Sequence, residues 1–165
     1  MAFVRSWLVL TVLFAAILIA GCSSIISQKT TFNSEALVWN GRLAIKVEDQ
    51  PSQSFSSSFQ LKGSAHSGEL SLLSPLGSVL ALLNWEPQGA SLRTGNELRT
   101  FASLEALMQA ATGTAIPVAA LFDWLAGVAT PVEGWQVDLS QQAQGRFVAR
   151  RTQPATELRF ILERE

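Results

Sequence analysis

Residues 69–85 read ELSLLSPLGSVLALLNW, and this stretch decides the fold prediction for the chain. Two apolar runs, 69–73 and 79–85, have the length of β-strands, and the segment SPLGS at 74–78 has the composition of a turn. The stretch therefore predicts a β-hairpin. Because both runs are apolar at odd and even positions alike, we expect other parts of the protein to cover this hairpin on both faces.

The turn of this hairpin places an apolar side chain at its apex. Pro75 suits the second position of a type I turn and Gly77 the fourth, which puts Leu76 at the tip. Polar residues usually occupy such a position, so an exposed Leu76 is a candidate wedge into acyl chains or a bilayer. The alternative is a leucine that folds back onto the sheet.

Strand patterns also lie on both sides of a helical region. Residues 39–47 and 54–62 alternate between apolar and polar side chains, which predicts two strands with one solvent-exposed face each. Further strands are predicted at 135–139, 146–151 and 158–162. So many strands predict an antiparallel sheet that curls.

Two short helices are predicted between the early and the late strands. Ser103 is a candidate N-cap for the first helix, which should end before Gly113. Pro117 opens the second helix, which should close at Gly127. Strands, two helices and strands again predict a mainly β fold, in which the helices lie on one side of the antiparallel sheet.

The N-terminal segment has the pattern of a secretory signal peptide. Arg5 precedes an apolar run at 7–19, and small residues then lead to Cys22, the one cysteine of the chain. This pattern is similar to the lipobox of bacterial lipoproteins, which implies cleavage before Cys22 and acylation of its sulfur and amino group. The alternative is an ordinary signal peptide that ends near a free thiol.

Three parts of the chain are expected from these patterns. Residues 1–21 form a cleaved signal peptide, and residues 22–34 form a lipidated N-terminus with a flexible, polar tether. Residues 35–165 form a single domain. With a lone cysteine, a hydrophobic core rather than a disulfide framework must stabilise this domain.

The charge balance argues against two classes of partner. The chain has 12 basic and 13 acidic residues, a formal net charge of −1, and no run of basic residues. We therefore expect no nucleic-acid binding and no electrostatic hold on an anionic membrane.

Catalytic motifs are not apparent in the sequence. His66 is the one histidine and lies in the predicted turn 63–68, which indicates a solvated histidine rather than part of a triad or metal site. No phosphate-binding loop or dinucleotide fingerprint occurs, so we expect no cofactor and no metal. A binding role is thus favoured over catalysis, with a lipid-anchored hydrolase that uses His66 as a distant alternative.

At residues 70–78 (LSLLSPLGS) the chain resembles the LolB family of outer-membrane lipoprotein receptors. Residues 39–44 (WNGRLA) are similar to the family's first sheet strand. Residues 112–118 (TGTAIPV) and 124–127 (WLAG) are similar to its paired helices. The resemblance runs from about Trp39 to Glu165.

The resemblance implies a curled antiparallel sheet, an incomplete β-barrel, with helices that cover an apolar cavity. It implies a non-enzymatic receptor that accepts lipoproteins from the periplasmic carrier LolA and inserts them into the outer membrane. The family's functional leucine corresponds to Leu76, between Pro75 and Gly77. Ser23 after Cys22 resembles the signal for the outer membrane, so we expect a lipid-anchored monomer at its periplasmic face, in contact with phospholipid.

Such a receptor has to shield the acyl chains of its client lipoproteins from water. Each exposed methylene costs about 0.8 kcal/mol. The strand faces supply the candidate lining residues Phe55, Phe59, Leu72, Leu82 and Trp85. An ordinary packed core is the alternative for these side chains. A structural lipoprotein that scaffolds an outer-membrane assembly would have such a filled core and an exposed sheet edge.

Overall fold

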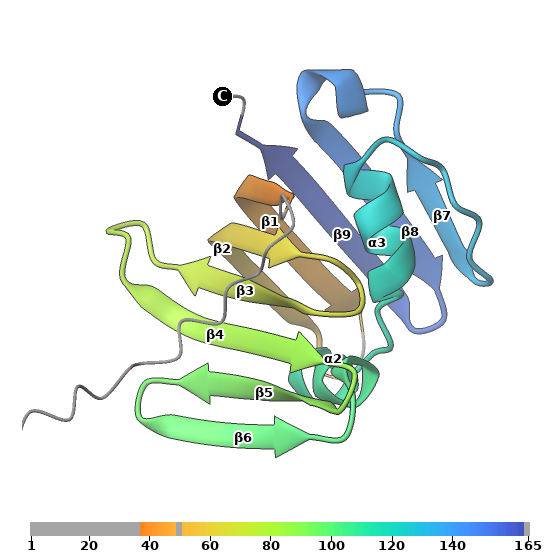
Figure 1. The fold of residues 1–165 in the computed structure, drawn as a ribbon. Coiled ribbons are helices and arrows are strands. Elements are labelled where there is room, and N and C mark those ends of the chain that lie inside the picture. Colours follow the sequence, from red (N-terminus) through yellow and green to blue (C-terminus); the bar gives the residue numbers. More distant parts are fainter. Residues whose placement is uncertain (1–36, 49–50, 164–165) are drawn as a thin grey trace, which may run out of the picture. The chain divides into compact units, whose positions relative to one another are not determined.

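A computed structural model describes residues 37–48 and 51–163. Cys22, the predicted signal peptide and the predicted tether lie outside the described residues. The described part contains nine strands, two α-helices and one short 3-10 helix, η2 (Gln142–Gln144) (Figure 1). The strands are β1 (Val38–Glu48), β2 (Gln53–Gly63), β3 (Gly68–Leu73), β4 (Val79–Glu86), β5 (Gly89–Thr94), β6 (Glu97–Phe101), β7 (Trp135–Asp138), β8 (Arg146–Thr152) and β9 (Ala155–Leu162).

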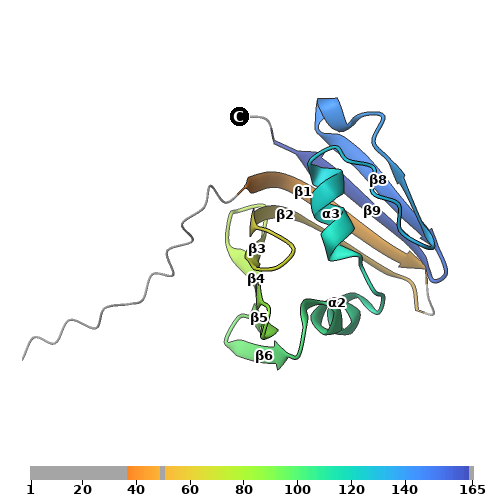
Figure 2. The same ribbon diagram turned by 45° about the vertical axis from the view of Figure 1, so that its right-hand side comes forward.

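All nine strands belong to one antiparallel sheet in the order β6-β5-β4-β3-β2-β1-β9-β8-β7. The first six strands form a meander, and β9 then pairs with the free side of β1. The ends of the sheet, β6 and β7, do not pair with each other. The sheet curls around the two helices without closing, as Figures 1 and 2 show, so the predicted incomplete β-barrel is confirmed.

Both helices lie inside the curl of the sheet, and their predicted ends are close to the observed ones. Helix α2 (Leu104–Thr112) begins after Ser103, whose hydroxyl accepts a hydrogen bond from the Ala106 amide at 3.2 Å. It ends at Gly113, which has a left-handed φ of +70°. Helix α3 (Val118–Leu125) follows Pro117. In Figure 2, α2 lies beside β5 and β6, whereas α3 lies across β1 and β9.

The hydrophobic core lies between the sheet and these helices. The inner positions of β1, β8 and β9 alternate with exposed ones, as a sheet with one wet face requires. The largest fully buried side chains of the core are Trp124, Phe59 and Phe147, each at most 2% exposed. Phe160 of β9 stacks on Phe147 with ring centroids 4.8 Å apart. No helix among the described residues is both long and apolar enough to cross a membrane.

One hairpin was absent from the sequence prediction. Strands β5 and β6 are joined through Gly95, which has a φ of +57°. A Gly-Asn pair between alternating runs is a hairpin signal, because glycine adopts a positive φ without a steric penalty. The alternation of apolar and polar residues in 89–101 is short and rich in polar residues, so the sequence pattern that predicts these two strands is weak.

Among the described residues, the β3–β4 hairpin is covered on its inner face, whereas the expected cover of its outer face is not found. Its inner face, which includes Leu83, packs into the core. On the outer face Leu80 is 43% exposed, and no described helix or strand covers it. The apolar residues on both faces of this hairpin therefore serve two environments, a core and a solvent-exposed surface.

Candidate functional site

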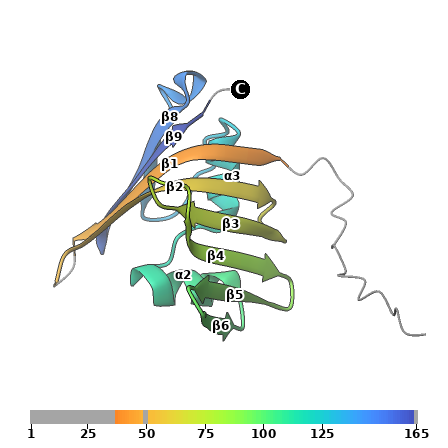
Figure 3. The same cartoon turned by 90° about the vertical axis from the view of Figure 1, so that its left-hand side faces the viewer.

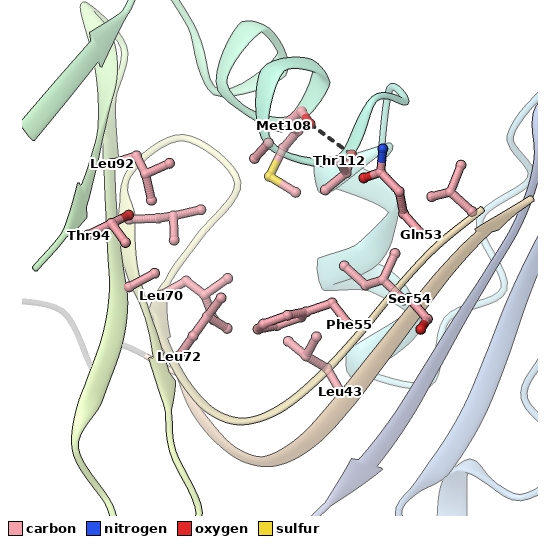
Figure 4. A pocket seen from close by; sticks show the side chains of 15 residues that line it. Leu43, Gln53, Ser54, Phe55, Leu70, Leu72, Leu92, Thr94, Met108 and Thr112 are labelled. Carbon is pink, nitrogen blue, oxygen red and sulfur yellow. Dashed lines mark hydrogen bonds between the residues drawn. The ribbon is translucent and has the colours of Figure 1, made fainter. Parts of the chain in front are cut away.

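The inner face of the curled sheet encloses a cavity of about 360 Å³ beneath α2 (Figure 4). Its size lies in the range of small-molecule pockets, about 300–1,000 Å³. Strands β1 to β5 and helix α2 supply the lining residues Leu43, Ile45, Val47, Gln53, Ser54, Phe55, Leu70, Leu72, Ala81, Leu83, Leu92, Thr94, Met108, Ala111 and Thr112. Most of these side chains are apolar, and none of them is charged.

This cavity has a buried floor and an exposed mouth. Leu43 and Leu83 are each only 5% exposed and lie at the floor. Phe55 is 41% exposed, and Thr94 and Ala111 are exposed as well. Figure 4 shows Phe55 between Leu43 and Leu72, with the sulfur-bearing side chain of Met108 facing them from α2. An apolar ligand can therefore enter from solvent without first unfolding the protein.

A second, smaller pocket of about 60 Å³ extends the first toward α3. All of its lining side chains are apolar. The two pockets have five lining residues in common, namely Leu43, Ile45, Leu70, Leu83 and Met108. Met108 therefore lies where the two pockets adjoin, and its unbranched side chain has three rotatable bonds.

Aromatic contacts fix α3 over the closed end of the smaller pocket. The ring of Phe122 lies 5.4 Å from that of Trp39 and 6.3 Å from that of Trp85. The Trp85 indole N–H donates a hydrogen bond of 2.9 Å to the Ser64 carbonyl, which satisfies its buried polar atom. A side chain at Gly68 would approach the Trp85 ring to 2.5 Å, so glycine is needed there.

The structure places four of the five predicted lining residues at these pockets. Phe55 and Leu72 line the larger cavity, whereas Phe59 and Trp85 line the smaller one. The prediction is wrong for Leu82, which lines neither. Successive side chains of a strand point to opposite faces, and the neighbours of Leu82, residues 81 and 83, are the ones that face the cavity.

Several lining residues were missed by the sequence prediction. Met108 and Thr112 were interpreted only as part of a covering helix, and Leu92 lies on the unpredicted strand β5. The helical spacing already placed Met108 on the inner face of α2, so the sequence could have predicted it as a lining residue. Leu92 required the pairing of β5 with β4, which the sequence does not specify on its own.

The β3–β4 turn presents Leu76 to solvent. The Gly77 amide donates to the Ser74 carbonyl at 2.9 Å, which closes a β-turn with Pro75 and Leu76 at its centre. Gly77 itself has a φ of +81°, and the Ser74 amide donates to the Ser78 carbonyl at 2.8 Å. Leu76 is 95% exposed, so the alternative of a leucine folded back onto the sheet is wrong.

His66 has no catalytic surroundings in the described structure. It is exposed in the β2–β3 turn, where its amide donates to the Ser64 hydroxyl. Asp123 accepts a hydrogen bond from the Thr130 hydroxyl, and Asp138 accepts one from the Ser140 amide. Within residues 37–48 and 51–163, no hydrogen bond or salt bridge joins His66 to a carboxylate, and no cluster of His, Cys, Asp and Glu could hold a metal.

Charged residues gather on the outer face of β1, β9 and β8. The Arg159 guanidinium donates to Glu157 and, with Arg150 on the other carboxylate oxygen, lowers the pKa of Glu157. The Lys46 ammonium lies 2.6 Å from Glu48, and the hydrogen bond between them raises the pKa of Lys46. The cavity lining is therefore uncharged, whereas the outer face of these three strands carries charges of both signs.

Comparison with known proteins agrees with this architecture. The sequence model of the family described as "Outer membrane lipoprotein LolB" matches residues 36–160. The chain belongs to the LolB family. It is 34% identical over 140 residues to the "Outer-membrane lipoprotein LolB" of Ralstonia nicotianae, which covers 80% of the chain and 66% of that relative.

Other LolB proteins are similar over comparable lengths. The identity is 31% over 145 residues to the LolB of Cupriavidus necator, covering 85% of the chain and 73% of the relative. It is 31% over 133 residues to that of Cupriavidus metallidurans, covering 78% and 64%. The aligned region thus spans about two thirds of the length of these LolB proteins. The resemblance seen in the turn and strand motifs is confirmed at the level of the family.

Proposed function

We propose that this LolB-family protein receives lipoproteins from the periplasmic carrier LolA and inserts them into the inner leaflet of the outer membrane. The acyl chains of the client lipoprotein bind in the cavity of about 360 Å³ between the sheet and α2. One observation supports this most: an uncharged cavity that opens to solvent lies in the same sheet as a turn that exposes a leucine almost completely.

The energetics of transfer favour such a cavity. The transfer of an acyl chain of typical length from the membrane into water costs about 12 kcal/mol of free energy, at about 0.8 kcal/mol per methylene. Contact with apolar side chains such as Phe55, Leu72 and Met108 replaces the membrane interior during transfer. The smaller pocket under α3 offers further apolar surface once Met108 moves. Binding of this kind requires no enzyme chemistry, cofactor or metal.

The exposed turn supplies a route from the cavity to the membrane. Leu72, two residues before the turn, lines the cavity, while Leu76 at the tip is exposed to solvent. Insertion of Leu76 among lipid acyl chains brings the membrane phospholipid next to the end of β3. The proposal further assigns Cys22 as the lipid attachment site of a monomer at the periplasmic face of the outer membrane.

Delivery of a lipoprotein into liposomes tests this proposal. Leu76→Asp should abolish most delivery, because a carboxylate at the tip is costly to insert into hydrocarbon. It should leave the free energy of unfolding within about 0.5 kcal/mol of the wild type, because Leu76 has almost no contacts to lose. Leu98→Asp is the matched control, since Leu98 is an exposed leucine on β6.

Equal delivery by Leu76→Asp and the wild type would contradict the role of the turn. If Leu98→Asp reduced delivery as much as Leu76→Asp does, an acidic substitution at any exposed leucine would be enough to reduce delivery. The turn would then have no specific role. The alternative of a structural scaffold requires a filled interior, and the cavity beneath α2 favours the receptor.

A further inference from the structure

The register of the sheet gathers cations on the outer face of β8, β9 and β1. Inner and outer side chains alternate along these strands, and the inner ones are buried in the core. The outer positions hold five exposed basic residues, namely Arg42, Lys46, Arg146, Arg150 and Arg159. We call this surface the basic face. Glu48, Glu157 and Asp138 of β7 are carboxylates on the same side, and the exposed Glu163 directly follows β9.

Two of these cations form no ion pair with any carboxylate of the described residues. Lys46 pairs with Glu48, while Arg150 and Arg159 share Glu157. Among the described residues, Arg42 and Arg146 form no salt bridge with a carboxylate. They flank Ile161, because β9 pairs this residue with Arg42 on one side and with Arg146 on the other. Ile161 is 53% exposed, so two guanidinium groups without a salt bridge to the described carboxylates border an exposed apolar side chain.

The basic face is continuous with the turn that carries Leu76. Arg42 lies opposite Ser58 of β2, and Ser58 lies opposite Leu73, the last residue of β3 before the turn. The Ser57 hydroxyl donates a hydrogen bond of 2.7 Å to the Leu73 carbonyl, which holds this end of β3 against β2. In Figure 3 the β3–β4 turn rises past β2 toward β1, while α2 lies below these strands.

We infer that the basic face binds the headgroups of anionic phospholipids when Leu76 enters the bilayer. Cations mixed with exposed apolar side chains are typical of surfaces that lie at a membrane interface, where arginine pairs with phosphate and apolar groups enter the acyl region. A partner that offers only negative charge would match the cations but leave Ile161 and Leu76 without an apolar contact. The inference rests on the proposed function of the turn and adds the lipid class that it favours.

The near-neutral composition concealed this surface. A net charge of −1 argued against an electrostatic hold on an anionic membrane. Only the pairing of β1 with β9 and of β9 with β8 brings the cations of three separate segments together. That expectation was drawn from the charge of the whole chain and did not consider how the charges are separated between the faces of the sheet.

A fluorescent probe on the outer face measures this contact directly in the full lipid-anchored chain. Ser56→Cys places the probe on β2 at an exposed outer position, next to Ala44 of β1. Val128→Cys, in the exposed segment after α3, is the matched control position. The chain without either substitution must take up no probe, which checks that Cys22 is blocked. Quenching by headgroup-labelled lipid is then compared in phosphatidylcholine vesicles with and without phosphatidylglycerol.

We expect the probe at position 56 to be quenched more strongly in the anionic vesicles, and this excess to fall at high salt. The double substitution Arg42→Gln with Arg146→Gln should weaken binding to the anionic vesicles by roughly tenfold, since each cation near an anionic surface contributes to the free energy of binding. The charge-matched pair Arg93→Gln with Arg99→Gln, on β5 and β6, should have little effect. The probe at position 128 should respond to none of these changes.

Quenching at position 56 that is the same in both vesicle types, or the same after both pairs of substitutions, would overturn the inference. So would a loss of transfer from the carrier in Arg42→Gln with Arg146→Gln without any quenching by vesicles, which would assign the face to an acidic protein. Delivery of a lipoprotein is measured in parallel. Quenching without delivery contradicts the proposed function, and delivery without quenching contradicts the basic face alone.

Discussion

The guanidinium of Arg151 donates a hydrogen bond of 3.1 Å to the hydroxyl of Thr114. Thr114 lies between α2 and α3 and is only 2% exposed, whereas Arg151 belongs to β8. A second hydrogen bond joins the same nitrogen of Arg151 to the Ala115 carbonyl at 3.4 Å. These contacts connect the segment between α2 and α3 to β8. They therefore help to hold α2 in place over the cavity.

Loss of this tie should destabilise the fold. Arg151→Met leaves the buried Thr114 hydroxyl without its partner, at a cost of about 1–3 kcal/mol. Adding Thr114→Val should restore part of that loss, because neither polar group is then left unpaired. Urea denaturation of the single and double variants measures both effects, with Arg146→Met as the control for removing a guanidinium without an ion pair. Strictly additive losses would show that the two side chains do not act together.

The pKa of Glu157 predicts a pH dependence of stability. Hydrogen bonds from Arg159 and Arg150 lower this pKa below its ordinary value of 4.5. A carboxyl with a lowered pKa in the folded state stabilises the fold above its unfolded pKa, and this contribution disappears as the pH falls through the folded value. Glu157→Gln should therefore reduce stability at pH 7, by about 0.2–1 kcal/mol for a partly exposed pair.

The difference between Glu157→Gln and the wild type should shrink as the pH is lowered past 4.5 toward the folded pKa. Unfolding midpoints in urea at pH 7 and at a strongly acidic pH provide the comparison. A gap that stays constant with pH would assign the effect of the substitution to packing rather than to the charge of Glu157.

Transfer without a nucleotide requires a difference in affinity between receptor and carrier. The cavity beneath α2 should bind an acyl chain more tightly than the carrier LolA does. A difference of about 1.4 kcal/mol in binding free energy gives a tenfold preference. A competition titration of the two proteins for one fluorescent acyl probe measures this order. A probe that stays with the carrier would leave the proposed direction of transfer without a driving force.

Much of the fold followed from local patterns in the sequence. The β3–β4 hairpin and its turn were predicted because Pro75 and Gly77 have strong positional preferences. Ser103 and Gly113 likewise marked the ends of α2 through their capping properties. Strands β5 and β6 were missed because their alternation is short and mostly polar, and the pairing with β4 that stabilises them is not local.

The cavity was predictable in kind but only partly in its residues. Phe55, Phe59, Leu72 and Trp85 reach the two pockets, whereas Leu82 points away. Trp85 and Leu82 are three positions apart on one strand, so they cannot face the same side. Because β4 carries apolar residues on both faces, the sequence alone did not indicate which of its leucines face the cavity. The basic face had no local signal at all, because it depends on the register between strands that are distant in sequence.

A pair of substitutions tests most directly whether the cavity beneath α2 binds acyl chains. Ala81 of β4 lines the cavity opposite Leu72, whereas Ala44 of β1 lies on the outer face. Both are partly exposed alanines in strands, so Ala81→Trp and Ala44→Trp add the same side chain to opposite faces. Titration of each folded variant with a fluorescent acyl probe measures its affinity. We predict that Ala81→Trp weakens binding about tenfold or more, equal to about 1.4 kcal/mol, and that Ala44→Trp binds as the wild type does. Wild-type affinity in folded Ala81→Trp would contradict the binding of acyl chains in this cavity.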